Sequence, residues 1–229
     1  MNKLVKNGLY IPPLHLCLHY ITNDFFLSTI ITQKLYVTNY YYHFEHLYDF
    51  VPHPYNWIKQ FVRFTDTGHI VSFLYYFEPR FLPLAHNVHF MITFGYWVSK
   101  LCLGMSDADD RHTEETILWF EKSWTYANHG LVYALVLYKI MTDTTCTISF
   151  SNTDLQYTYM WLYAWFIFIY IPWRYYTRDP VYSILDNHSS LKTKITIFIM
   201  MNSFVYISNY IGYILSHTCQ MDMWDHYTI

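Results

Sequence analysis

Charged side chains are scarce in this 229-residue chain. Lys, Arg, Asp and Glu together account for 14% of the residues, whereas an ordinary soluble domain has about 25%. The formal net charge is −3 and the sequence contains no basic block, so nothing in it indicates a nucleic-acid partner. Because hydrophobic residues make up 53% of the chain, the shortage of charge predicts an integral membrane protein surrounded by membrane lipids.

Cysteine is too sparse and too scattered for a disulfide framework or a zinc site. Cys17, Cys102, Cys146 and Cys219 form no Cys-x-x-Cys pair, so they are interpreted as unpaired, small apolar residues. The pattern of a cleaved signal peptide is also missing, because the first residues are followed by Pro12–Pro13 and not by an apolar core.

Signatures of a metal or cofactor site are absent as well. The sequence has no His-x-x-Glu-His motif and no paired-carboxylate signature. Histidine is the commonest ligand of transition metals, and a metal or haem carrier would use His69, His86, His89 and His129. Without a ligand motif the sequence predicts neither metal nor cofactor, and this carrier function ranks below the two that follow.

Aromatic residues, in contrast, are abundant. They make up 22% of the chain, with 25 Tyr, 17 Phe and 8 Trp, and Tyr and Trp favour the membrane interface. From residue 61 onward, apolar segments approach or reach the ~17–25 residues of a helical span. They are Phe61–Phe77, Leu84–Leu103, Thr125–Met141, Tyr157–Pro172 and Ile195–Leu215. Runs of this length do not alternate as barrel strands do, so we expect an all-α, multi-pass transmembrane bundle of about five helices.

The chain is divided on this basis into three parts. Residues 1–60 form an aromatic- and His-rich N-terminal segment, residues 61–215 the transmembrane helical domain, and residues 216–229 a short tail. Polar residues interrupt Leu14–Ile31, so the sequence does not decide whether this segment spans the membrane. Tyr36–Trp57 fits an interfacial helix better than a span.

The positive charges support this segmentation. Five spans place most of the basic residues on one side of the membrane, which the positive-inside rule assigns to the cytoplasm or the mitochondrial matrix. On that side are Lys59, Arg63, Lys100, Arg111, Lys122, Arg174, Arg178, Lys192 and Lys194, whereas Arg80 and Lys139 lie on the other.

A polar group opens the first apolar segment, in Phe61-Val-Arg-Phe-Thr65-Asp66-Thr-Gly-His69. Thr65 and His69 are four residues apart and therefore share one face of a helix. A hydroxyl beside an imidazole base is a possible nucleophile. The structural alternative is a polar helix start with Thr65 or Asp66 as its cap. Gly68 would allow another helix to approach closely here.

A second polar group, Asn128-His129-Gly130, opens the third apolar segment. A lipid-facing helix has no use for such a pair, which must be buried in protein, lie at the interface or take part in function. An imidazole oriented by a neighbour acts as a general base near neutral pH. The alternative is a buried histidine whose hydrogen bonds are satisfied by another helix.

The order and spacing of several motifs resemble those of a known family. Asp110-Arg111 precedes Asn128-His129-Gly130 by eighteen positions, and an apolar helix then ends near Met141. Upstream stand Arg63-Phe-Thr65, Ile70–Phe77 and Phe94-Gly-Tyr-Trp97, and downstream stand Trp173 and Pro180–Leu185. Over residues 57–215 the chain resembles the androgen-induced and androgen-dependent membrane hydrolases, which are related to the rolling-stone proteins.

The resemblance implies an activity and a site. Members of the family are multi-pass proteins of the endoplasmic reticulum or plasma membrane, and those that are enzymes hydrolyse fatty-acid esters of hydroxy fatty acids with a Thr nucleophile and a His. Here Thr65 would be the nucleophile and His129 the base, with Asn128 and His69 in support. This chain departs from the family at Val132, where the family has a second His that is linked to catalysis.

The sequence therefore leaves two functions open. The first is a lipid-ester hydrolase, which requires the side chains of Thr65 and His129 to lie within hydrogen-bonding reach at one lipid-accessible cavity. The second is a non-catalytic accessory subunit of a larger membrane complex, such as a respiratory assembly of the mitochondrial inner membrane. In that case aromatic residues would supply contact area for the partner subunits.

Overall fold

The computed structural model describes residues 11–22, 27–28, 31–32, 35, 58, 61–105, 126–143 and 147–227. For residues 11–14, 22, 127–128 and 218–227 it describes the backbone alone. Every regular element in these ranges is a helix, which confirms the all-α fold. The N-terminal helix α2 spans Ile11–Thr22, and the segment Tyr36–Trp57 lies outside the described residues.

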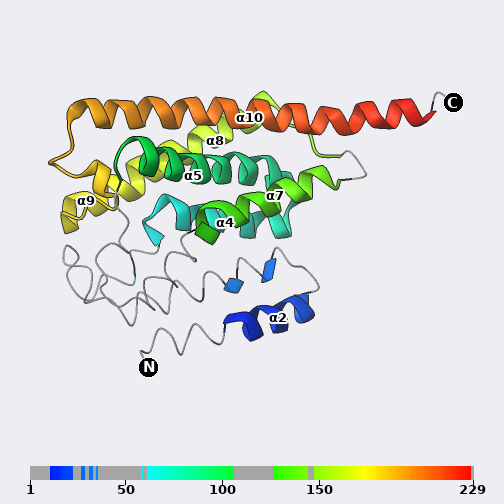
Figure 1. Ribbon diagram of the computed structural model, residues 1–229, viewed down its shortest axis with the longest axis horizontal. Coiled ribbons are helices and arrows are strands. Elements are labelled where there is room, and N and C mark those ends of the chain that lie inside the picture. Colours follow the sequence, from blue (N-terminus) through cyan, green and yellow to red (C-terminus); the bar gives the residue numbers. More distant parts are fainter. Residues whose placement is uncertain are drawn as a thin grey trace.

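Each of the five apolar segments contains a helix (Figure 1). The order along the chain is α4 (Phe64–Phe77), η3 (Pro79–Phe81), α5 (Leu82–Cys102), η5 (Ala127–Leu131), α7 (Val132–Met141), α8 (Asn152–Ala164), η6 (Trp165–Tyr170), α9 (Ile171–Thr177), η7 (Ser183–Leu185) and α10 (Leu191–Tyr227). The last helix does not end near Leu215 but continues to Tyr227, and in Figure 1 it extends past the rest of the bundle.

Helix α5 is the central element of the bundle, and it contacts α4, α7, α8 and α10. Pro83 lies in its first turn, where the missing N–H leaves no hydrogen bond unmade. Almost every residue from Leu82 to Ile92 is buried. On the α4 side, a Cβ added to Gly68 would lie 2.3 Å from Ile92 Cδ1. The close approach of a second helix at Gly68 is therefore confirmed.

Helix α4 begins without a side-chain cap of its own. The N-cap residue is Arg63, and its side chain makes no capping hydrogen bond. Thr65 and Asp66 lie in the first turn and are buried, so the structural alternative in which one of them caps the helix is wrong. With 14 residues and a rise of about 1.5 Å per residue, α4 is about 21 Å long, which is shorter than the hydrocarbon core of a bilayer.

The fourth apolar segment forms a longer helix than the sequence suggested. Helices α8, η6 and α9 follow one another without a break from Asn152 to Thr177. A capping box between Ser151 and Asp154 begins the helix. Pro172 does not end it, because η6 is a π-helical stretch just ahead of the proline. The wider turn of a π-helix changes the register of the backbone hydrogen bonds, so that the missing N–H is accommodated.

A buried polar layer connects the helices through Asn87. Its amide nitrogen donates to Thr158 Oγ1 (2.9 Å) and Asn209 Oδ1 (3.1 Å). Its amide oxygen pairs with Nδ1 of His86 (3.1 Å), whose Nε2 hydrogen-bonds to the Tyr133 hydroxyl (3.3 Å). Helices α5, α7, α8 and α10 are thus joined by one network, and its members satisfy one another in an otherwise apolar core.

The remaining buried histidines also have neighbours on other helices. His89 on α5 pairs with the Ser72 hydroxyl on α4, and its ring stacks on that of His69 at 5.9 Å. Within the described residues, no group of three or more His, Cys, Asp and Glu side chains is placed to hold a metal ion. His69, His86 and His89 thus each make contacts that connect two helices.

The basic residues collect at one end of the bundle. Leu82, Ile140, Phe150 and Leu215 pack together at the opposite end, which carries Arg80 and Lys139. Successive helices run in opposite directions. The start of α4, the end of α5, the end of α9 and the start of α10 therefore lie together at the basic end. That end carries Arg63, Lys100, Arg174, Arg178, Lys192 and Lys194, whereas Lys59, Arg111 and Lys122 lie outside the described residues.

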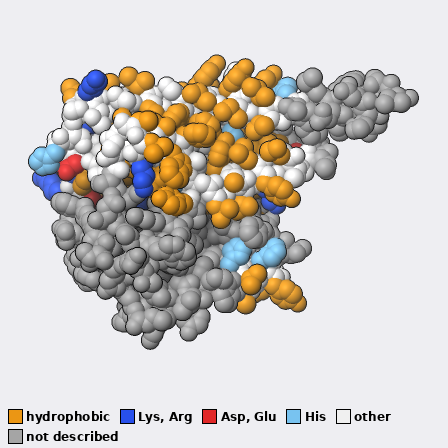
Figure 2. All heavy atoms as spheres, viewed as in Figure 1, with side chains coloured by type: hydrophobic (Ala, Val, Ile, Leu, Met, Phe, Trp, Pro, Cys, Tyr) orange, Lys and Arg blue, Asp and Glu red, His pale blue; other side chains and the backbone are white. Residues whose placement is uncertain are grey.

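The outer surface of the bundle is largely apolar. Hydrophobic side chains cover much of the described surface in Figure 2. Helix α10 contributes exposed apolar and aromatic residues along its length, namely Ile195, Phe198, Ile199, Tyr206, Ile207, Tyr210, Tyr213 and Ile214. Among the described residues, Leu191–His217 is the one helical stretch long and apolar enough to cross a membrane. Association with a membrane is the conclusion that this surface supports.

The Asn87 network makes a stability prediction. Asn87→Leu keeps the volume but removes one hydrogen bond each from Thr158, Asn209 and His86, and a buried polar atom left unsatisfied costs about 1–3 kcal/mol. We expect the variant to lose roughly 2–4 kcal/mol of folding stability and to unfold at a lower temperature in a thermal-melting assay in mild detergent. Asn152→Leu, at an exposed position of α8, is the matched control. Equal melting temperatures for the two variants would contradict the structural role of the network.

Candidate functional site

A cavity of about 450 Å³ opens at the basic end of the bundle. Its walls come from the start of α4, the second half of α5, η5, the α8–η6 helix, the loop after α9 and the first half of α10. Most of its lining is apolar, for example Met91, Ile92, Leu162 and Met201. A cavity of this size and character suits part of a lipid or another apolar small molecule.

Thr65 and His129 meet at this cavity. Thr65 Oγ1 lies 3.3 Å from His129 Nε2, and both residues line the cavity wall. They come from different helices and are 64 positions apart in the chain. The proximity that the hydrolase hypothesis requires is therefore present. Only about a twelfth of the Thr65 surface is exposed (8%), so its hydroxyl is accessible mainly through the cavity.

The backbone around His129 departs from an α-helix. Residues Ala127–Leu131 form a π-helical turn, and His129 itself has φ −104° and ψ 18°. Its carbonyl accepts a hydrogen bond from Trp97 Nε1 on α5 (3.2 Å), which is a partner outside its own helix. Single π-turns occur frequently at functional sites, and here the turn brings the imidazole to the start of α4.

Tyr96 fixes the plane of the imidazole. Its ring stacks on His129 with centroids 3.8 Å apart and planes 16° from parallel. Lys100, one turn further along α5, donates from Nζ to the Tyr96 hydroxyl (3.2 Å). An imidazole held flat against a tyrosine has little freedom to turn, so Nε2 stays directed toward Thr65.

Tyr182 is a third polar group at the nucleophile, and the sequence did not assign it a role. The Phe64 N–H, which has no partner within α4, donates to the Tyr182 hydroxyl (2.9 Å). Thr65 follows Phe64 directly, so this hydrogen bond places the Tyr182 hydroxyl close to the predicted nucleophile. Burial raises the pKa of the Tyr182 phenol, so it stays protonated at neutral pH and keeps a proton to donate. A loop residue of this kind has no periodic sequence signal.

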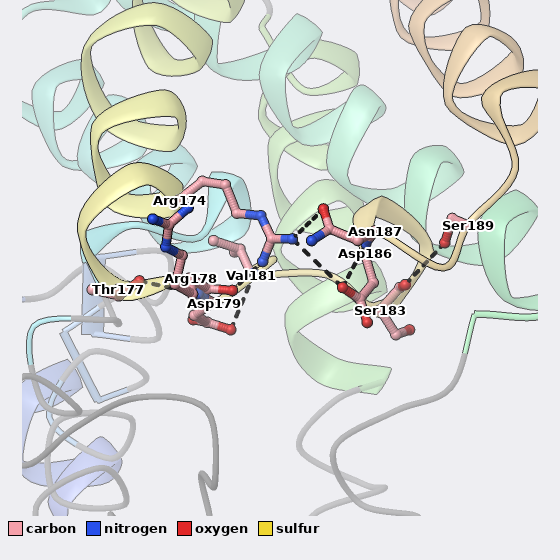
Figure 3. A network of polar contacts seen from close by, with 9 residues as sticks. All are labelled: Arg174, Thr177, Arg178, Asp179, Val181, Ser183, Asp186, Asn187 and Ser189. Atoms are coloured by element: carbon pink, nitrogen blue, oxygen red, sulfur yellow. Dashed lines mark hydrogen bonds and ion pairs between the residues drawn. The ribbon is translucent and has the colours of Figure 1, made fainter.

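The loop that carries Tyr182 is itself fixed by polar contacts (Figure 3). Arg178 ends α9 in the left-handed conformation with φ 64°. The Asp179 carboxylate accepts hydrogen bonds from the Val181 N–H (3.2 Å) and from Trp173 Nε1 (2.9 Å). On the other side of the loop, the Arg174 guanidinium donates to Asn187 Oδ1 (2.8 Å). These contacts hold Tyr182 against the start of α4.

His69 and Asn128, the residues predicted to support Thr65 and His129, are placed differently from that pair. His69 is almost fully buried (1% exposed), stacks on His89 and does not line the cavity. It therefore does not share the site with Thr65, although the two lie on one helix. Asn128 takes part in the π-helical turn through its backbone, and its side chain is outside the described atoms.

The arrangement has the parts of an acyl-transfer site. A hydroxyl lies beside an imidazole that can accept its proton, and a protonated phenol lies beside the same hydroxyl. Thr65 is also in the first turn of α4, where the positive end of the helix dipole favours a developing negative charge. Comparison with protein-family models, with curated proteins and with solved structures gave no match.

The contact between Thr65 and His129 can be tested without an assumed substrate. In a background with all four native cysteines replaced by Ser, Thr65→Cys places a thiol beside the imidazole, which favours the reactive thiolate. We expect this thiol to react with iodoacetamide at pH 7 about tenfold faster than after the further change His129→Gln. Thr67→Cys, buried in the same helical turn, is the control. Equal alkylation rates with and without His129→Gln would show that the two side chains do not interact.

Proposed function

We propose that the protein is a membrane-embedded lipid-ester hydrolase with Thr65 as the nucleophile and His129 as the general base. The observation that carries the proposal is the 3.3 Å contact between Thr65 Oγ1 and His129 Nε2 on the wall of an apolar cavity. A threonine hydroxyl is a poor nucleophile unless a base removes its proton. The placement of the pair therefore favours ester cleavage over simple binding.

The residues at the cavity have distinct parts in the proposed reaction. His129 Nε2 takes the proton of Thr65 as Thr65 Oγ1 attacks the ester carbonyl carbon. The resulting oxyanion is stabilised by the Tyr182 phenol and the positive end of the α4 helix dipole. The C–O bond to the alcohol then breaks, and His129 returns the proton to the departing alcohol oxygen. Water, deprotonated by the same imidazole, hydrolyses the acyl-threonine to a free fatty acid and restores the hydroxyl.

The resemblance to the androgen-induced and androgen-dependent membrane hydrolases supports the same reaction. In that family a second His follows Asn-His-Gly, and Val132 stands in its place here. Val132 is fully buried in an apolar cluster with Leu82 and Val136. Because His129 itself reaches Thr65, the proposed site is complete without a second histidine.

We further propose that the bundle is a multi-pass membrane protein of the endoplasmic reticulum or plasma membrane. The exposed apolar face of α10 and the scarcity of charge support this placement. The basic residues at the cavity end would face the cytoplasm. The proposed site would then lie near the cytoplasmic face, where a lipid ester could reach it sideways from the membrane.

The alternative is a non-catalytic accessory subunit, for example in the mitochondrial inner membrane. It is favoured by the exposed aromatic side chains on the outer faces of α8, α9 and α10, such as Tyr157, Tyr175, Tyr176 and Tyr210. Aromatic surface of this kind serves subunit contacts as well as lipid contacts. Co-purification of stable partner proteins from the native membrane, together with absent esterase activity, is the outcome that favours it.

Turnover of a lipid ester tests the hydrolase proposal. Purified protein should release fatty acid from a long-chain ester presented in mixed micelles, and Thr65→Ala should lower kcat by at least about 10³-fold because the nucleophile is lost. Thr65→Ser should keep part of the activity. Thr67→Ala removes a hydroxyl that bonds to the Phe64 carbonyl within the same turn and should change kcat by less than about threefold. Undiminished activity of Thr65→Ala would rule out this mechanism.

The membrane placement makes a separate prediction. In a cysteine-free background, Glu78→Cys lies in the turn between α4 and α5, and His188→Cys lies in the loop before α10, at the opposite end of the bundle. After selective permeabilisation of the plasma membrane, a membrane-impermeant maleimide should label Cys at position 188 from the cytoplasm. Cys at position 78 should be labelled only from the opposite side, which is the outside of intact cells or, for the endoplasmic reticulum, the lumen after full solubilisation. Labelling of both positions from the same side would contradict an odd number of spans between them.

A further inference from the structure

The π-helical stretch η6 stands apart from α10 along the cavity. Helix α8, which precedes η6, packs against α10, and η7, which follows α9, packs against α10 again. Between them the backbone of η6 makes at most a marginal contact with α10, and in Figure 1 the continuous α8–η6–α9 helix diverges from α10 toward its α9 end. The cavity occupies this space, because residues of both η6 and α10 line it.

The opening of the cavity is marked by lining residues that are also exposed at the surface. Phe198 on α10 is 55% exposed, Phe166 on η6 is 38% exposed and Tyr163 on α8 is 37% exposed. The lining residues of α4 and α5, such as Thr65 and Ile92, are buried. The cavity therefore reaches the surface through a gap between η6 and α10 that Phe166 and Phe198 flank. This gap is termed the window.

Hydrogen bonds bound the window at its two ends. Toward the core of the bundle, the Tyr163 hydroxyl donates to Asn202 Oδ1 (2.6 Å), and the Tyr159 hydroxyl donates to the Asn202 carbonyl (3.1 Å). Toward the basic end, the Arg174 guanidinium donates to Asn187 Oδ1 (2.8 Å). Both bonded ends belong to the cavity wall. The window is thus a bounded opening and not a general separation of the helices.

The two phenylalanines that flank the window differ in how they are held. The ring of Phe166 stacks on that of Tyr170, with centroids 5.4 Å apart and planes 16° from parallel. In the part of the chain that the structure describes, no aromatic ring is stacked on Phe198. An exposed side chain without a fixed partner changes rotamer within nanoseconds. Phe198 is therefore the side chain that can move to widen the window.

The outer surface beside the window is apolar. Ile167 and Phe168 are exposed on η6, and Ile195 and Ile199 are exposed on α10. Exposed apolar patches mark sites of contact with membranes or apolar ligands. A ligand from water would have to cross this patch, whereas an acyl chain in the lipid phase meets the window directly.

We propose that the window is the entrance from the lipid phase to the cavity, and that Phe198 controls the passage of an acyl chain through it. The inference rests on the proposed function for the identity of the ligand, a long-chain lipid ester. The entrance itself concerns binding and not cleavage. Phe198 is then a specificity-determining residue, because its position sets the width of the opening that an acyl chain must pass before the ester reaches Thr65.

Photolabelling of the cavity wall tests the entrance without reference to catalysis. In a background with all four native cysteines replaced by Ser, Phe198→Cys is modified with benzyl methanethiosulfonate, which attaches a bulky group through a disulfide. The full-length protein in phosphatidylcholine vesicles receives hexadecanol with a diazirine midway along its chain, is photolysed and is analysed by peptide mass spectrometry. We expect the modification to abolish labelling of the buried wall residues Met91 and Ile92 and to leave labelling of the exposed Ile207 unchanged.

Three controls separate a blocked entrance from a damaged protein. Reduction with dithiothreitol removes the benzyl group and should restore labelling of Met91 and Ile92. Ile199→Cys, modified in the same way, should leave that labelling intact, because Ile199 is as exposed as its neighbour Phe198 but does not line the cavity. Phe166→Cys, on the other side of the window, should behave as Phe198→Cys does.

The outcomes distinguish the entrance from the hydrolase proposal. Labelling of Met91 and Ile92 that persists in modified Phe198→Cys, or that is absent from the unmodified protein, would overturn the entrance. Turnover of 4-nitrophenyl hexadecanoate is measured on the same samples and should be lost on modification of Phe198→Cys and recovered on reduction. Labelling that Phe198→Cys controls, without turnover in any sample, would overturn the hydrolase proposal and leave the entrance standing.

Discussion

The burial of α5 is the constraint on which the rest of the structure depends. Four helices pack around it, so each of its polar side chains must find a partner on a neighbour. In the first half of α5, Asn87 hydrogen-bonds to side chains on α8 and α10. His89 hydrogen-bonds to Ser72 on α4. These contacts fix the rotation of α4 and α10 about α5. The same rotation opens a cavity beside the second half of α5, where Gly95 and Ser99 leave space.

Two irregular stretches of backbone bring further polar groups to Thr65. A π-helical turn presents His129 to Thr65, and a loop fixed by Arg174 and Asp179 holds the Tyr182 hydroxyl against the start of α4. Each brings a polar group to the same threonine at the end of an otherwise well-packed bundle. The concentration of local irregularity around one hydroxyl is the structural reason to regard it as a reactive group.

Much of the fold follows from the sequence because long apolar segments in a charge-poor chain have few alternatives to helices. The meeting of Thr65 and His129 could also be expected, since each is a polar group at the start of an apolar segment. Two features could not. A π-turn carries the helix past Pro172, the residue at which the predicted segment stopped. Tyr182 reaches the site only through the packing of the loop after α9, and tertiary contacts of that kind leave no periodic pattern.

Attack of Thr65 on an ester carbonyl leaves an acyl group on its side chain, which covalent trapping detects. Purified protein is mixed with excess 4-nitrophenyl hexadecanoate, quenched in acid within the first turnover and analysed by peptide mass spectrometry. We expect a hexadecanoyl group on the peptide that contains Thr65, at a level that falls when His129 is replaced by Gln. A hexadecanoyl group on another residue, or turnover of the ester without any acylated Thr65, would contradict it.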